Sequence, residues 1–253
     1  MDDLKTWRAA RLKALTAPDG WLNLTDRIEF GPGRHSVGSD EICDLRLSCG
    51  PGFLGWLIDL PGQKTAFQCA TGERKNFKST KGSPPRTKAA PFLLEIHLVG
   101  DKPALRVRWT ADRPGYKFAG LRYFPTEPDW VITARWEKLA EPVALQVDMI
   151  SGAVETVLQT YVARFHREGH DIALVPTHAK AGKPMFVIRD ATSGHETYAA
   201  SRFLIGEVLD DHIILDFNRA HTPPCGFTDF AICPLPPPEN RLPFAVRAGE
   251  LAP

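Results

Sequence analysis

The residues best suited to chemistry lie near the carboxyl end of the chain. Asp216 interrupts the otherwise apolar run 213–217, where burying a carboxylate without a partner is costly. Arg202 and Arg219 are the candidate partners. Such a pair is either a buried ion pair that fixes strand register or part of a ligand site, and the sequence leaves both interpretations open.

A register argument brings more polar residues to the same place. If residues 206–211 connect two strands of a hairpin, Arg202 lies opposite Asp216. The same argument for the preceding hairpin places Asp190 opposite Tyr198. Because side chains alternate along a strand, three adjacent strands would present one polar surface. Its members would be Asp190, Tyr198, Arg202, Asp216 and Asn218.

This surface predicts the binding of a small anionic molecule, because the planar guanidinium group of arginine suits carboxylate and phosphate. The proline-rich segment 233–238 is stiff and extended, so it could hold nearby polar groups in place or simply cover a sheet edge. The predicted ligand-binding residues are Asp190, Tyr198, Arg202, Asp216, Asn218, Arg219, Glu239 and Asn240.

The alternative function is a hydrolase acting on an ester, amide or sugar-like substrate. Cys225 could be a nucleophile activated by His221, with Asp216 or Asp229 orienting the imidazole, or Asp216 could itself be a general base. Most cysteines are small buried apolar residues. His221, Cys225 and Cys233 lack a fourth zinc ligand. We therefore expect no metal or cofactor.

A third hypothesis is a structural or protein-interaction module. Residues 71–90 are rich in basic side chains among Ser, Gly and Pro, which predicts a solvated loop. In an interaction module, the basic loop from Arg74 to Lys88 would be the contact surface.

Composition limits the class of protein. The chain has 253 residues, of which 43% are hydrophobic and 24% charged, with 31 basic and 30 acidic side chains. This balance favours neither nucleic acid nor a membrane surface as a partner. The amino terminus lacks the pattern of a secretory signal, and five cysteines form an odd set. We expect a cytoplasmic protein without disulfides; its oligomeric state is left open.

The fold class follows from the spacing of apolar segments and turn residues along the chain. Residues 3–16 have helical spacing, and short apolar segments separated by Gly and Pro turns follow them. We predict a mainly β protein, an antiparallel sandwich or barrel-like architecture with a short N-terminal helix. Two β subdomains are expected, 1–140 and 141–253. The expected strands are 21–24, 34–38, 43–47, 54–59, 92–99, 104–110, 130–137, 143–149, 171–175, 185–190, 198–205 and 212–217, with 154–166 favouring strand over helix.

Two stretches together resemble a known family. The first comprises Trp7, Arg8, Arg11, residues 19–24, Gly33 and residues 37–39. The second comprises residues 215–225, 233–243 and 247–250, which include Asn-Arg-Ala-His-Thr-Pro-Pro-Cys and Cys-Pro-Leu-Pro-Pro-Pro-Glu-Asn-Arg-Leu-Pro. They resemble the bacterial and archaeal family known as domain of unknown function 1684, over nearly the whole chain. The resemblance implies a prokaryotic protein and assigns no reaction, cofactor or catalytic residue.

Overall fold

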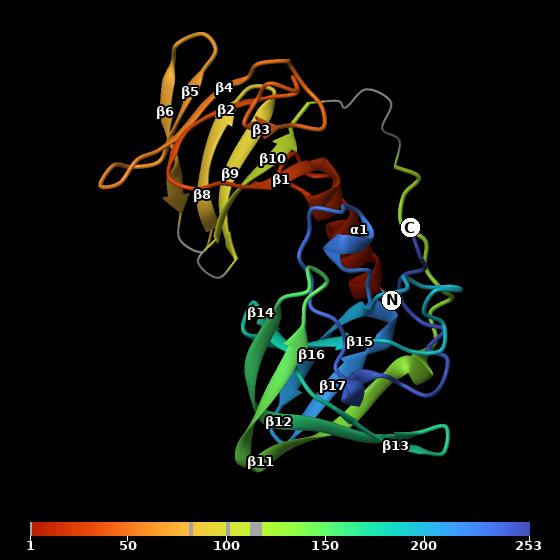
Figure 1. Cartoon of the computed structure of the whole chain (residues 1–253). Coiled ribbons are helices and arrows are strands. Elements are labelled where there is room, and N and C mark those ends of the chain that lie inside the picture. Colours follow the sequence, from red (N-terminus) through yellow and green to blue (C-terminus); the bar gives the residue numbers. More distant parts are fainter. Residues whose placement is uncertain (1, 81–82, 100–101, 112–117) are drawn as a thin grey trace. The chain divides into compact units, whose positions relative to one another are not determined.

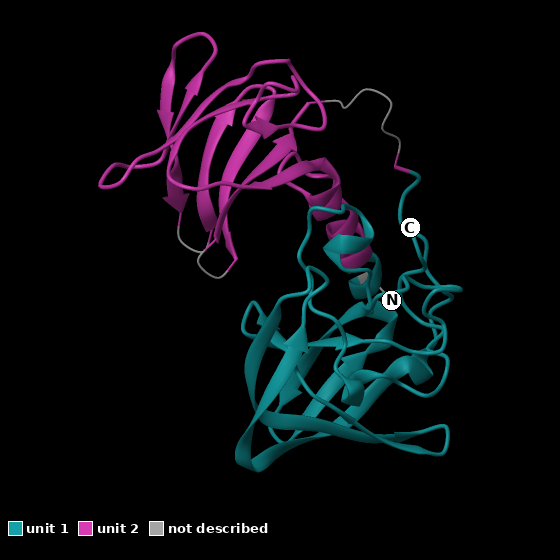
Figure 2. Ribbon diagram, in the orientation of Figure 1, with its two compact units in different colours: residues 1–5, 119–253 teal, residues 6–118 magenta. Residues whose placement is uncertain are grey.

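The computed structural model describes residues 2–80, 83–99, 102–111 and 118–253. Internal contacts divide the chain into two compact units (Figure 2). Residues 6–118 form the N-terminal unit, and residues 1–5 with 119–253 form the C-terminal unit. The expected boundary between residues 140 and 141 falls inside a strand, β11 (Val131–Asp148).

The N-terminal unit contains two antiparallel-rich sheets (Figure 1). The helix α1 (Asp2–Thr16) and the 3-10 helix η1 (Trp21–Asn23) come first. One sheet has the order β1-β10-β9-β8-β7, formed by β1 (Leu24–Glu29), β7 (Lys78–Thr80), β8 (Ser83–Ala89), β9 (Phe92–Val99) and β10 (Lys102–Trp109). The other has the order β3-β2-β4-β5-β6, formed by β2 (Gly33–Gly38), β3 (Leu45–Arg46), β4 (Gly55–Asp59), β5 (Ala66–Cys69) and β6 (Arg74–Asn76).

These two sheets pack face to face, because a single apolar core draws side chains from both. Val37 and Leu57 belong to one sheet, Leu94 and Leu105 to the other, and all four are fully buried. The alternation of strand side chains places the residues between them, such as Glu95, on the opposite face of their sheet. The predicted sandwich is therefore confirmed for this unit.

The C-terminal unit contains one sheet of seven strands in the order β13-β12-β11-β17-β16-β15-β14 (Figure 1). The strands besides β11 are β12 (Val154–Arg167), β13 (His170–Leu174), β14 (His178–Lys180), β15 (Lys183–Ile188), β16 (Arg202–Leu209) and β17 (His212–Asp216). The 3-10 helices η2 (Pro128–Trp130), η3 (Phe217–Arg219), η4 (Pro224–Gly226) and η5 (Pro238–Asn240) lie outside the sheet.

The carboxyl-terminal segment of the chain forms part of the core of this unit. Leu242, Phe244, Val246 and Ala248 are buried and join the core cluster that contains Ile213. Because every second residue is buried, the segment lies extended against the rest of the core. The signature around residues 233–250 is thus a structural cover for the C-terminal sheet.

Several local predictions were wrong, and the reasons are physical. The basic segment 71–90 forms β6, β7 and β8 rather than a loop, because cross-strand pairing overrides the low strand propensity of its Lys, Ser and Pro residues. Of the strand expected at 21–24, residues 21–23 form η1 and only Leu24 belongs to a strand, as the first residue of β1. The two strands expected at 130–137 and 143–149 are one long strand, β11, with an irregularity in its pairing between Lys138 and Val143. The helix and the strand assignment of 154–166 are confirmed.

Candidate functional site

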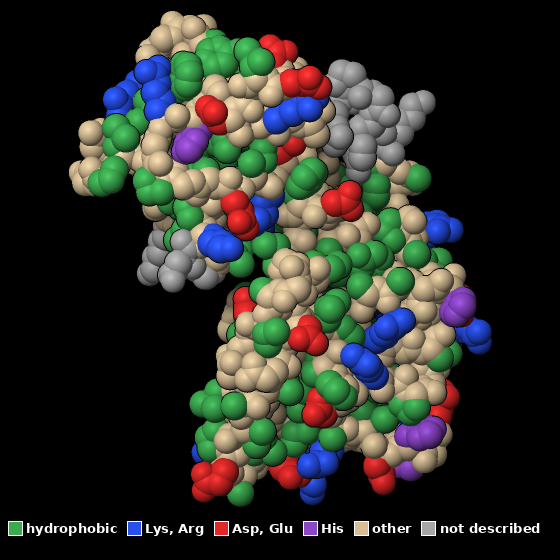
Figure 3. Space-filling model, in the orientation of Figure 1, with side chains coloured by type: hydrophobic (Ala, Val, Ile, Leu, Met, Phe, Trp, Pro, Cys, Tyr) green, Lys and Arg blue, Asp and Glu red, His purple; other side chains and the backbone are tan. Residues whose placement is uncertain are grey.

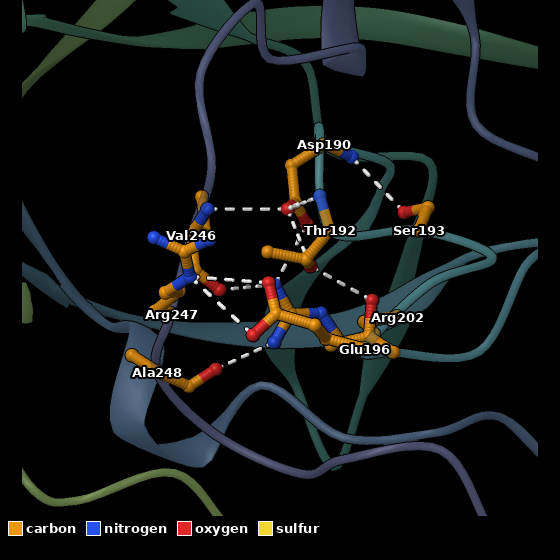
Figure 4. A network of polar contacts seen from close by, with 9 residues as sticks. Asp190, Thr192, Ser193, Glu196, Arg202, Val246, Arg247 and Ala248 are labelled. Atoms are coloured by element: carbon orange, nitrogen blue, oxygen red, sulfur yellow. Dashed lines mark hydrogen bonds and ion pairs between the residues drawn. The ribbon is translucent and has the colours of Figure 1, made fainter.

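Arg202 is the most deeply buried charged residue of the predicted cluster (Figure 4). It lies at the start of β16, and its side chain is 1% exposed. One terminal nitrogen donates to the Ala248 carbonyl. The other donates to Asp190 Oδ2 at 2.7 Å and to the Val246 carbonyl at 2.9 Å. The two terminal nitrogens are therefore occupied by the carboxyl-terminal segment and one carboxylate, whereas Nε is buried without a hydrogen-bond partner among the described residues.

Asp190 is equally occupied by groups of the protein itself. Its Oδ1 accepts hydrogen bonds from the Thr192 amide at 2.8 Å, the Thr192 hydroxyl at 2.6 Å and the Val246 amide at 3.1 Å. The side chain of Asp190 is 0% exposed. The pair is a dry structural ion pair that ties β16 to the carboxyl-terminal segment.

The predicted pairing of Arg202 with Asp216 is wrong. The connection between β16 and β17 is the two-residue turn Asp210-Asp211, so Leu209 pairs with His212. This register differs by three residues from the expected one, and an odd shift turns side chains to the other face. Arg202 pairs instead with Ile188.

Tyr198 also lies elsewhere than predicted. It precedes β16 and does not pair with Asp190 in the sheet. Its hydroxyl donates to the Cys225 carbonyl at 3.0 Å. Burial, together with a hydrogen bond to the Cys225 side chain, raises the pKa of Tyr198. Tyr198 therefore belongs to a separate cluster around Cys225.

Asn218 and Asn240 use their side-chain amides in the same way. Asn218 accepts from the Glu127 amide at 3.1 Å and donates to the Glu127 carbonyl at 3.0 Å. Asn240 accepts from the Val175 amide and donates to the Val175 carbonyl, both at 2.8 Å. Each side-chain amide bonds both the N–H and the C=O of one backbone residue, as a neighbouring strand would. Both are buried, so their roles in the fold are structural.

Four predicted residues retain access to solvent: Tyr198, Asp216, Arg219 and Glu239. Arg219 is 33% exposed, forms an ion pair with Asp216 at 3.0 Å and donates a hydrogen bond to Asp3. Glu239 is exposed in η5. Of the predicted ligand cluster, Arg219 alone offers a cationic group that solvent reaches.

Cys225 is surrounded by Tyr198 and Cys233. The Cys225 amide lies 3.4 Å from Cys233 Sγ. A hydrogen bond with the Cys233 thiol lowers the pKa of Cys225; burial opposes this, and the Tyr198 hydroxyl adds to it. His221, the predicted activating base, holds its Nδ1 3.0 Å from the Arg219 carbonyl and its ring against Phe203.

The N-terminal unit holds a second arginine cluster that the sequence analysis missed. Strand register places Lys78, Arg86, Glu95, Arg106 and Arg27 in one row across five strands. Residues directly opposite each other share a face of the sheet. The row thus contains four cations and one carboxylate. Only the full strand pairing brings it together, since its members come from segments up to 79 positions apart.

Glu95 is the common anion of this cluster. It lies 2.7 Å from Arg86 Nε, 3.3 Å from Arg106 Nη1 and 3.1 Å from Arg108 Nη1. Burial would raise the pKa of Glu95, but the three guanidinium groups outweigh it and the pKa is lowered. Arg106 and Arg108 also lie over the Trp21 ring, at 5.4 and 5.8 Å.

Arg27 and Arg86 of the cluster also pair with the exposed Glu29 and Asp19, at 3.2 and 3.1 Å, but the buried Arg106 and Arg108 share Glu95. Among the described residues, Arg27 Nε and Nη2, Arg106 Nε and His97 Nδ1 are buried with no hydrogen-bond partner. Burial and the neighbouring Arg106 and Arg27 lower the pKa of His97 to about 4. The imidazole is therefore neutral at pH 7 beside an excess of positive charge.

The division of charge between the units explains this excess. Residues 6–118 contain 18 Lys and Arg and 11 Asp and Glu, a formal net charge of +7. The C-terminal unit contains 13 and 19, a net charge of −6. The near-zero total of the chain therefore hides two opposite charges. On the visible face of the N-terminal unit, a group of basic side chains lies over the β5–β6 hairpin (Figure 3).

A pocket of about 480 Å³ opens in the N-terminal unit. Its apolar floor is Phe77, Pro85 and Ile96. Its polar wall is formed by Gln63, Lys64, Thr65, Lys78 and Ser79. Within the described part of the chain, neither lysine takes part in an ion pair. The pocket has the size of a small-molecule site.

The comparisons with known proteins now identify the family. A family model described as "Protein of unknown function (DUF1684)" matches residues 116–251. The chain belongs to this family. The chain is similar to an uncharacterised protein of Haloarcula marismortui solved by solution NMR, at 30% identity and a TM-score of 0.44, covering 53% of this chain and 77% of that one. No curated protein matches. None of the helices within the described residues could span a membrane.

Proposed function

We propose that this member of the DUF1684 family binds a small anionic molecule, a carboxylate or a phosphate, in the N-terminal unit. The pocket beside Lys64 and Lys78 is the observation that carries this proposal. Two ammonium groups at one rim attract an anion, and hydroxyl and amide groups beside them can complete its hydrogen bonds. The apolar floor favours a ligand with a carbon skeleton over a bare ion.

The charge of the whole unit supports the same ligand class. A net charge of +7 on residues 6–118 raises the local concentration of anions and speeds their arrival. The net charge of the unit therefore attracts anions from a distance, and the two lysines attract them at the pocket.

The predicted C-terminal site is the weaker location. Hydrogen bonds within the protein already engage the side chains of Arg202, Asn218 and Asn240. A ligand would have to displace those bonds. Arg219 is accessible but already faces Asp216 and Asp3. A ligand there would meet two carboxylates beside one guanidinium group.

Calorimetric titration with phenyl phosphate, benzoate and inorganic phosphate tests the proposal. We expect phenyl phosphate to bind more tightly than inorganic phosphate, because its ring can cover the apolar floor. The double variant Lys64→Ala/Lys78→Ala should lose about 10-fold or more in affinity, since it removes two charge-assisted contacts.

Lys13→Ala/Lys88→Ala is the matched control, because it removes the same charge from exposed positions of the same unit. It should leave the affinity within about 2-fold. Equal losses in both double variants would show a general charge effect and contradict the pocket. Loss of binding in Arg219→Ala alone would place the site in the C-terminal cluster.

A further inference from the structure

We propose that Cys225 and Cys233 form a redox-active dithiol, in which hydrogen peroxide oxidises Cys225 and Cys233 then closes a disulfide. This inference is independent of anion binding, because it concerns the other unit. It replaces the predicted Cys225–His221 pair by the residues that the structure places beside the Cys225 thiol.

Two anchors from different parts of the C-terminal unit hold the cysteines together. The Tyr198 hydroxyl donates to the Cys225 carbonyl at 3.0 Å. The Ile150 amide, in the turn between β11 and β12, donates to the Cys233 carbonyl at 2.9 Å. With both backbones fixed, Cys233 Sγ lies 3.4 Å from the Cys225 amide. The Cys233 sulfur therefore lies against the backbone of Cys225, and a disulfide between them requires Cα atoms within about 7 Å of each other.

The surroundings of the sulfur suit a nucleophilic thiolate. A hydrogen bond from the Cys233 thiol stabilises the charged form of Cys225 and lowers its pKa against the opposing effect of burial. The Tyr198 hydroxyl adds to this when its single proton turns from the Cys225 carbonyl to the sulfur. Cys225 is half-buried, whereas Cys233 is 3% exposed. A small oxidant from solvent therefore reaches Cys225 first, and Cys233 is positioned to attack it afterwards.

Gly226 makes room for this arrangement. A Cβ atom at residue 226 would lie 2.3 Å from Thr222 Cγ2 and 3.3 Å from Cγ of Tyr198. The absence of a side chain thus lets the Tyr198 ring pack against the backbone beside Cys225. The Tyr198 ring therefore packs closely against the tight turn of η4.

The chemistry balances in two steps. The Cys225 thiolate attacks one oxygen of hydrogen peroxide, the O–O bond breaks, and the released hydroxide takes up a proton to give water and a sulfenic acid. The Cys233 thiol then attacks the Cys225 sulfur, and the hydroxyl leaves with the thiol proton as a second water. Both sulfurs are oxidised by one electron each while peroxide is reduced. A dithiol reductant reverses the disulfide.

Cys43 provides an internal contrast. Its thiol donates to the Gly52 carbonyl at 3.3 Å, and burial together with Asp40 and Asp44 raises its pKa. A thiol that acts as donor and is held in its neutral form is a poor nucleophile. Peroxide should therefore discriminate between Cys225 and Cys43.

The test is peroxide treatment of the full-length chain, followed by alkylation in denaturant and peptide mass mapping. We expect the five alkylatable thiols to fall by two, with a 225–233 linkage that dithiothreitol reverses. Cys233→Ser should stop at a sulfenic acid that dimedone traps on Cys225. Cys69→Ser, which removes a half-buried cysteine of the other unit, should still form the linkage.

The variant Tyr198→Phe tests whether the Tyr198 hydroxyl positions and activates Cys225 rather than only supporting the fold. It should raise the midpoint pH of Cys225 alkylation and slow oxidation several-fold, while the unfolding midpoint falls only by the small amount expected for one lost hydrogen bond. If Cys225 of the wild type reacts no faster than Cys43, or if peroxide gives no 225–233 linkage, the proposal is wrong. The wild-type mapping decides this even if a variant fails to fold.

Discussion

Arg202 with Asp190 and Glu95 with its three arginines are both buried centres of opposite charge, but their surroundings differ. In the C-terminal unit, the terminal nitrogens of Arg202 donate to two backbone carbonyls and to Asp190, and the carboxylate accepts backbone and hydroxyl donors as well. In the N-terminal unit, Glu95 is shared by Arg106, Arg108 and Arg86, the last of which also pairs with the exposed Asp19. The comparison separates a neutralised structural pair from a centre with surplus positive charge.

The difference shows why a buried arginine alone is poor evidence for a ligand site. Arg202 was predicted to bind a ligand because the expected hairpin register placed it opposite Asp216. The pocket and the surplus of cations instead belong to the unit where the family model matches only residues 116–118. Both centres hold a buried guanidinium nitrogen without a hydrogen-bond partner among the described residues, Arg202 Nε in one and Arg106 Nε in the other. They differ in how many arginines share one buried carboxylate.

The largest effect is expected for Arg202→Met. The substitution leaves the Asp190 carboxylate buried without its cation, and we expect a loss of about 3–5 kcal/mol in the free energy of unfolding, measured with urea. Arg247→Met is the control, because Arg247 pairs with Glu196 while 67% exposed, and should cost less than about 1 kcal/mol. Similar losses in both variants would remove the distinction between buried and surface pairs.

Glu95→Gln tests the other centre and should cost about 2–4 kcal/mol, because the arginines lose their common anion. The folded-state pKa of Glu95 is lowered from 4.5, so its contribution is present above about pH 4.5 and is lost as the pH falls through the lower folded value. Urea unfolding of the variant should show a weaker acid dependence than the wild type. An unchanged acid dependence would mean that Glu95 is not ionised in the folded protein.

Asn240→Ala should cost about 1–3 kcal/mol, because the amide and carbonyl of Val175 both lose their partner inside the protein. Asn240→Asp keeps the acceptor for the amide and loses the donor to the carbonyl, so it should retain part of the stability. Hydrogen exchange at Val175 reports the effect locally. Exchange that is no faster in Asn240→Ala would contradict the clamp.

His97→Gln should have the smallest effect, about 1 kcal/mol or less, because the ring is half exposed and solvent screens its charge. The folded-state pKa is about 4, below its usual 6.5. The unfolded state therefore binds more protons between these values, and stability rises with pH from 4 to 6.5. Above pH 7, the free energy of unfolding should depend on pH in the same way in the wild type and the variant. A wild type that loses stability as the pH rises from 4 to 6.5 would contradict the lowered pKa of His97.

The sequence by itself determined the fold class and most of the elements. Periodicity predicted α1, and short apolar segments between Gly and Pro turns predicted strands such as β9 and β10, because such patterns are local information. It also marked the C-terminal signature. It predicted that Asp190 and Arg202 share a polar surface with Asn240; in the structure Asp190 bonds to Arg202, whereas Asn240 bonds to Val175.

Only the tertiary structure decided what those residues do. A two-residue turn at Asp210-Asp211 moved the register of Arg202 by three positions, and no local pattern specifies such a shift. The row from Lys78 to Arg27 and the contact of Cys225 with Cys233 likewise depend on pairings and anchors between distant segments. Partners of polar groups are chosen by the whole fold, and that choice decides whether a charge is satisfied or remains available to a ligand.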